Sequence, residues 1–157
     1  MPLKRSTTLQ PLSRQHHNGL LFCLLLKKGI RNNISPRILQ DFCMYFRQND
    51  LAGHFRLEEE CLAPLPKRFH ALQNGIGKMI EEHEEIMKLF AAIGQSPSTE
   101  HITKLYHLIE SHIRFEERSL FPLLEATLPP GELAVIGKAL AHSEEHNCIS
   151  YPVKFWE

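Results

Sequence analysis

The stretch His54-Phe-Arg-Leu-Glu58-Glu-Glu-Cys-Leu-Ala-Pro64-Leu returns, nearly copied, as His112-Ile-Arg-Phe-Glu116-Glu-Arg-Ser-Leu-Phe-Pro122-Leu. One histidine, one arginine, two glutamates, two leucines and one proline recur at identical offsets in the two copies. On a helix, residues i and i+4 lie one turn apart on the same face, so each copy directs an imidazole and a carboxylate toward one place. Imidazole and carboxylate together suit iron, manganese or zinc, and the repeat therefore predicts a metal site.

A simpler explanation exists for each copy taken alone. Histidine and glutamate at helical spacing are usually solvated neighbours on a helix surface, and such ion pairs contribute little. The frame shared by both copies favours the metal site, since surface pairs need no common context. Two such pairs on facing helices would converge on the interior of a bundle.

Composition limits the classes of partner. The chain has 157 residues, enough for one domain, with 18 Lys and Arg against 18 Asp and Glu. Without a basic stripe or a long apolar run, we expect neither nucleic acid nor a membrane as partner. The apolar run Leu20 to Leu26 is too short for a membrane span and does not resemble a secretory signal. Four widely spaced cysteines without a Cys-x-x-Cys motif indicate free thiols, which predicts a cytoplasmic protein.

Proline, glycine and serine divide the chain into helical segments. The positions of these residues predict helices over about 12–28, 36–62, 67–93 and 98–120, followed by a weaker segment over about 132–146. Long helices joined by short loops predict an all-α fold, an up-down-up-down four-helix bundle with a short extra C-terminal helical segment. We expect a single domain over 1–157, with the core bundle at about 12–125 and a C-terminal extension at about 126–157.

The other two predicted helices each supply a histidine. His83 stands alone on the third helix, and the first helix carries the adjacent pair His16 and His17. Each half of the chain is then a histidine helix followed by a His-x-x-x-Glu helix. Helix phase decides whether His16 or His17 faces inward; we favour His16 and keep His17 as the alternative. His142 and His146, four apart on the weak fifth segment, are expected to have no functional role.

These motifs resemble the hemerythrin-like His-His-Glu cation-binding family over about residues 12 to 125. Ferritin-like bundles also hold two irons, but they use Glu-x-x-His, with the opposite order and a different spacing. The resemblance implies two iron ions, joined by an oxo or hydroxo group, with the carboxylates bridging and the histidines terminal. The metal-ligating residues it implies are His16, His54, Glu58, His83, His112 and Glu116. Glu117, five residues after His112, is an alternative to Glu116.

The ligand set also suggests a function. With about five ligands each, the two irons would keep roughly one open position apiece, where oxygen or nitric oxide could bind or react. We expect a role in iron handling or in redox or nitrosative stress. The alternatives are a metal-stabilised regulatory or scaffold module that reports iron status, or reversible oxygen binding. Met79 and Met87 stand where oxygen carriers resembling this chain place a further histidine, which predicts a more open centre beside His83 and counts against simple carriage.

Whether the protein is an enzyme stays open at this point. The sequence shows no Ser-His-Asp set, phosphate loop or nucleotide fingerprint, so an enzyme with a defined organic substrate ranks third.

Overall fold

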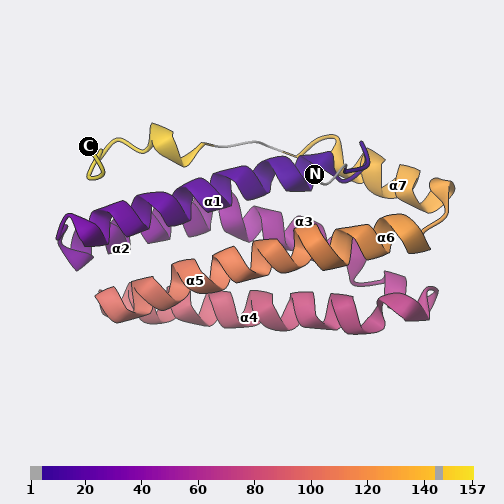
Figure 1. Ribbon diagram of the computed structural model, residues 1–157, viewed down its shortest axis with the longest axis horizontal. Helices are drawn as coiled ribbons and strands as arrows, with labels where there is room; N and C mark the ends of the chain where they lie inside the picture. The colour runs from indigo at the N-terminus through magenta and orange to yellow at the C-terminus, as the bar shows by residue number, and fades with distance from the viewer. Residues whose placement is uncertain (1–4, 144–146) are drawn as a thin grey trace.

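Four long helical rods run alternately up and down in the computed structural model, which describes residues 5–143 and 147–157 (Figure 1). The rods are α1 (Gln10–Arg31); α2 (Pro36–Phe46) continued by the π-helical turn η1 (Arg47–Leu51) and α3 (Ala52–Leu62); α4 (Gln73–Gln95); and α5 (Thr99–Phe115) continued by the π-helical turn η4 (Glu116–Leu120) and α6 (Phe121–Thr127). No strand occurs in the described part of the chain. The predicted all-α four-helix bundle is therefore confirmed.

Serine residues begin two of the rods. The hydroxyl of Ser35 accepts a hydrogen bond from the backbone N–H of Arg37, and that of Ser98 accepts one from His101, both at 3.3 Å. The third rod starts later than the sequence predicts. Two short 3-10 turns, η2 (Leu65–Lys67) and η3 (His70–Leu72), occupy the chain before α4, so the prolines that suggested a helix start belong to a turn.

The fourth rod does not break at Pro122, as the sequence suggested. Pro122 lies in the first turn of α6, directly after a π-helical turn, where a missing backbone N–H is tolerated. The carbonyl of Glu117 accepts a hydrogen bond from the guanidinium of Arg5 instead. The helix continues through this irregular turn to Thr127, and Arg5 supplies a donor for a carbonyl within the turn.

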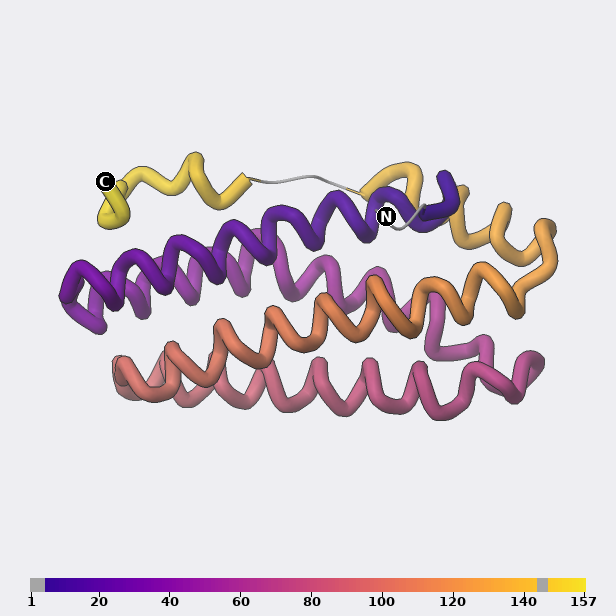
Figure 2. Tube along the Cα trace, in the orientation of Figure 1, coloured from indigo at the N-terminus to yellow at the C-terminus, as the bar shows by residue number. Residues whose placement is uncertain are grey.

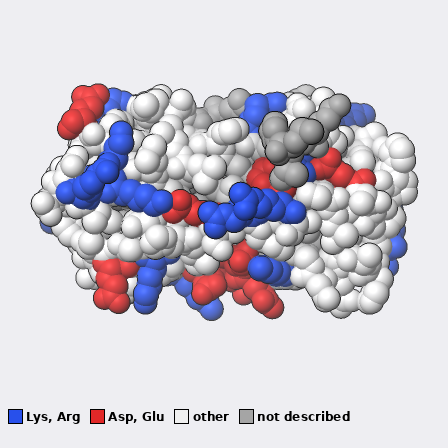
Figure 3. Space-filling model, viewed as in Figure 1, with Lys and Arg blue, Asp and Glu red and all other residues white. Residues whose placement is uncertain are grey.

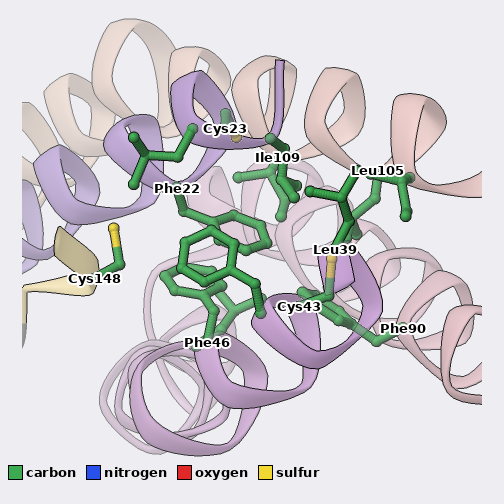
Figure 4. Packing of buried hydrophobic residues seen from close by; sticks show 14 of the residues in the cluster. Phe22, Cys23, Leu39, Cys43, Phe46, Phe90, Leu105, Ile109 and Cys148 are labelled. Carbon is green, nitrogen blue, oxygen red and sulfur yellow. The ribbon is translucent and has the colours of Figure 1, made fainter. Parts of the chain in front are cut away.

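Two apolar clusters fill the bundle. In the larger one, Phe22 stacks on Phe46 with ring centroids 3.9 Å apart, and three of the four cysteines are buried as free thiols (Figure 4). The smaller one gathers leucines from the other end of each rod, such as Leu12 and Leu62. Along every rod the sequence passes from one cluster to the other through buried histidine or glutamate. A polar layer thus divides the core across all four rods.

The C-terminal extension packs on the outside of this bundle. The helix α7 (Pro130–Leu140) ends sooner than predicted, and residues 144–146 of the expected segment lie outside the described residues. The turn η5 (Cys148–Ser150) then leads a tail that runs beside α1 (Figure 2). The backbone N–H of Cys148 donates to Asn18 at 2.7 Å, and the ring of Phe155 lies 5.1 Å from that of Phe42. The extension therefore covers α1 and α2.

Charged side chains of both signs lie beside one another on the face shown in Figure 3. Lys27 and Glu110, for example, form an ion pair of 2.8 Å across α1 and α5. Among the described residues no helix combines the length and the apolar character that a membrane crossing requires.

Candidate metal centre

Six buried polar side chains converge in the layer between the two apolar clusters. They are His16 from α1, His54 and Glu58 from α3, His83 from α4, His112 from α5 and Glu116 from η4. Their ligand atoms form two groups, and within each group these atoms lie within 4.8 Å of one another. Both groups contain Glu58 and Glu116, neither of which is exposed to solvent at all. We call the group with His16 and His54 the first position, and the group with His83 and His112 the second position.

The repeated motif has the geometry that its spacing predicts. The Nε2 atom of His54 lies 2.7 Å from Oε1 of Glu58, and that of His112 lies 2.8 Å from Oε1 of Glu116. The Nε2 atom of His16 lies 2.9 Å from the other oxygen of Glu116. The Nε2 atom of His83 lies 3.6 Å from one oxygen of each carboxylate, so both have histidines from more than one helix around them, as a carboxylate shared by two cations requires.

The atoms that face one another in this layer are not satisfied by hydrogen bonds. All four histidine Nε2 atoms and both oxygens of Glu58 and Glu116 are buried, and none has a hydrogen-bond partner of suitable geometry. Burying polar groups in this state is costly, and most native proteins avoid it. A cation in each position would satisfy all of them, and imidazole with carboxylate suits iron, manganese or zinc. The residues present therefore fit a metal centre.

The opposite ring nitrogen of each histidine does have a partner. Nδ1 of His16 donates to Glu117 at 2.7 Å, and Nδ1 of His83 donates to Glu59 at 2.9 Å. These two glutamates occupy equivalent places in the repeated motif, directly after Glu58 and Glu116. A hydrogen bond at Nδ1 fixes the tautomer that leaves Nε2 free for a metal.

The remaining two histidines also donate a hydrogen bond from Nδ1 to a side-chain oxygen. Nδ1 of His54 donates to the side-chain oxygen of Gln15, and Nδ1 of His112 donates to Glu82 at 2.9 Å. All four imidazoles are therefore oriented with Nε2 toward the centre. Neither Gln15 nor Glu82 was predicted to have a role. Each directly precedes a centre-facing histidine of its own helix, His16 or His83, but the histidine it contacts lies on another helix and is brought to it only by the fold.

Protons balance the buried carboxylates when no cation is bound. Burial alone would lower the pKa of His16, but Glu116 and Glu117 outweigh it and raise that pKa to about 9. The same opposition, in which Glu116 again outweighs burial, raises the pKa of His83 to about 9 and that of His112 to about 10. Burial would raise the pKa of Glu116, yet these histidines hold it well below its usual value. A bound cation would therefore displace protons from His16, His83 and His112.

The alternative ligands lie elsewhere. His17 is exposed, so the phase of α1 turns His16 inward. Glu117 belongs to neither group of ligand atoms and contacts the far side of the His16 ring. His142 is exposed, and His146 lies outside the described residues.

A cavity of about 360 Å³ adjoins the centre between α1, η1, α3 and α5. Its wall includes three of the converging residues, His16, His54 and His112, and it reaches exposed residues such as Arg14 and Asn49. The open space therefore connects the centre with the surface.

The cavity does not lie where the sequence suggested. Neither Met79 nor Met87 is among the described residues that line it, because Met79 is buried in the smaller apolar cluster and Met87 packs against the larger one. The methionine side chains on either side of His83 therefore pack into the apolar core, and the cavity adjoins His16, His54 and His112 instead.

Comparison with protein families agrees with this geometry. The family model for the hemerythrin HHE cation-binding domain matches residues 7–124, which contain all six converging side chains. No curated protein and no solved structure matches the chain. With a match over most of its length, and with a helical bundle that carries clustered histidine and glutamate, this chain belongs to the hemerythrin HHE cation-binding family.

Proposed function

We propose that this protein binds two iron ions through His16, His54, Glu58, His83, His112 and Glu116, and that the loaded centre binds or reacts with oxygen or nitric oxide. One observation carries the proposal. Eight buried ligand atoms face one another without hydrogen bonds of suitable geometry, while each of the four converging histidines donates a hydrogen bond from Nδ1 on the opposite side of its ring. Bound iron would supply a redox-active Lewis acid with room for a small ligand.

The residues of the chain have separable tasks in this function. Glu58 and Glu116 hold negative charge where both positions can share it, and the histidines present neutral nitrogens. Phe55 stacks on His83 with ring centroids 3.7 Å apart and so excludes water from one side of the second position. The cavity beside the first position gives a small molecule a way in, and its wall contains the apolar side chains Ile109 and Ile113.

Iron loading under anaerobic conditions tests the proposal. Metal analysis after removal of loose iron should give about two irons per chain, and exposure to oxygen or nitric oxide should change the absorption spectrum. One iron or none would contradict the dinuclear centre. Two irons with no spectral response to either gas would contradict the proposed reactivity alone.

Burial of the two carboxylates also favours a second candidate, a metal-stabilised regulatory module. Because Glu58 and Glu116 are fully buried, a cation between them would stabilise the bundle, and iron supply would be reported as stability. A large rise in melting temperature on iron binding, together with indifference to oxygen and nitric oxide, would favour this candidate over the first.

A further inference from the structure

In both halves of the bundle, the centre-facing histidines donate a hydrogen bond from Nδ1 to a side chain of a neighbouring helix. The charge of these acceptor side chains differs between the two halves. In the second position, Nδ1 of His112 donates to the carboxylate of Glu82 at 2.9 Å. In the first position, Nδ1 of His54 donates to the neutral amide oxygen of Gln15. These contacts are equivalent by the internal repeat, so the exchange of amide for carboxylate is a real difference between the halves.

The acceptors of the other two histidines, Glu117 for His16 and Glu59 for His83, also leave less negative charge at the first position than at the second. Glu117, which holds His16, forms an ion pair of 3.0 Å with the guanidinium of Arg5, a nearly buried side chain that also pairs with Glu125. Among the described residues, no lysine or arginine nitrogen lies within 4.0 Å of Glu59, which accepts from His83, or of Glu82, which accepts from His112.

The charge of the acceptor at Nδ1 changes how strongly the imidazole binds a cation at Nε2. A carboxylate that accepts the Nδ1 proton makes the opposite nitrogen a stronger donor to a cation, and it adds a negative charge nearby. A neutral amide orients the ring equally well but does neither. The second position therefore has two unneutralised carboxylates behind its histidines, whereas the first has one amide and one carboxylate paired with arginine.

We infer that the two metal positions are inequivalent: the second binds a divalent cation more tightly, and Gln15 keeps the first the weaker of the two. This inference rests on the proposed dinuclear centre. Gln15 and Glu82 are positioning residues, because they act on the cations through His54 and His112. The cation in the first position is also the more electron-poor, and so the easier to reduce.

An anaerobic cobalt(II) titration of the full chain, followed by visible absorption, tests this inference. The wild type should bind two cobalt ions in two steps whose dissociation constants differ by about 10- to 100-fold, the range over which such outer contacts change metal affinity. Gln15→Glu should tighten only the weaker step, and Glu82→Gln should weaken only the tighter one. Each variant alone should narrow the gap. Glu81→Gln, which removes the same charge from an exposed neighbour, should change neither step.

Mössbauer spectra of the iron(II)-loaded protein give an independent reading. The wild type should show two resolved quadrupole doublets, of which Gln15→Glu should shift only one. A general loss of structure would broaden both doublets, so this result separates an electronic effect from misfolding.

Three results would overturn the inference. They are two equal steps in the wild type, an effect of Glu82→Gln on the weaker step, and a change in both steps caused by Gln15→Glu. Absence of cobalt and iron binding would instead contradict the proposed function itself, which keeps the two failures distinguishable.

Discussion

Glu58 and Glu59 are adjacent, yet the structure gives them different relations to the metal centre. Glu58 belongs to both positions, with Oε1 at 2.7 Å from Nε2 of His54 and 3.6 Å from Nε2 of His83. Glu59 contacts only the far nitrogen of His83, and its side chain is 43% exposed. Glu58→Gln and Glu59→Gln therefore remove the same charge from neighbouring residues and form a matched pair.

The structure sets the size of the two effects. Loss of an outer hydrogen-bond partner costs about 10- to 100-fold in metal affinity, which is about 1.4 to 3 kcal/mol. Glu59 is half exposed, so its charge is partly screened, and Glu59→Gln should cost about tenfold at the second position and nothing at the first. Glu58→Gln removes a direct ligand from both positions, so each should lose more than about 100-fold.

Metal analysis and cobalt(II) titration of both variants measure these losses. After gel filtration, Glu59→Gln should retain most of the two metals, whereas Glu58→Gln should retain almost none. Circular dichroism should show that both variants remain helical. Equal losses in the two variants would mean that the inward face of α3 has been assigned to the wrong glutamate.

Raising the pH from 7 to 9 should tighten metal binding about 100-fold or more, as cobalt titrations can measure, because protons on His16, His83 and His112 compete with the cation. Folding raises these three pKa values, so the protonated histidines stabilise the metal-free fold fully below about pH 6.5. The melting temperature of the metal-free protein should fall as the pH rises through about 9 to 10. Gly53→Leu should narrow the cavity, since a Cβ there meets open space, and should slow oxidation of the iron-loaded protein in stopped-flow absorbance without lowering metal content. Gly29→Ala should lower the free energy of unfolding in denaturant by about 1 to 3 kcal/mol, because the added Cβ would lie 2.6 Å from a buried leucine methyl.

Each of these expectations has a contrary outcome. An affinity independent of pH would mean that the histidines are unprotonated before metal binds. An unchanged oxidation rate in Gly53→Leu would mean that oxygen enters by another route. Full stability in Gly29→Ala would mean that the leucine methyl and the C-terminal tail move aside at no cost.

Internal repetition made much of the fold readable from the sequence. Two motifs with His and Glu four residues apart fixed which faces of two helices turn inward, and serine and proline marked most helix starts. The start of α4 and the continuation through Pro122 were predicted wrongly. Both depend on local geometry, namely a pair of 3-10 turns and a π-helical turn that Arg5 supports, and periodicity does not encode either.

The converging residues were easier to predict than the contacts behind them. His16, rather than His17, faces the layer, but a one-residue choice on a helix requires its phase, which packing of the whole bundle decides. The roles of Gln15 and Glu82 depend on which histidine of another helix lies beside them. Such pairings between helices are set by tertiary structure, so a single sequence without its fold could not assign them.

Iron stoichiometry, measured together with the optical spectrum, tests whether the six converging side chains hold two irons. The full chain should be loaded with iron(II) without oxygen, freed of loose metal, analysed for iron, and then exposed to oxygen. We expect about two irons per chain and new near-ultraviolet absorption after oxidation, both lost in Glu58→Gln and both retained in Glu81→Gln. One iron per chain, or two irons that survive Glu58→Gln, would contradict a dinuclear centre built on the shared carboxylates.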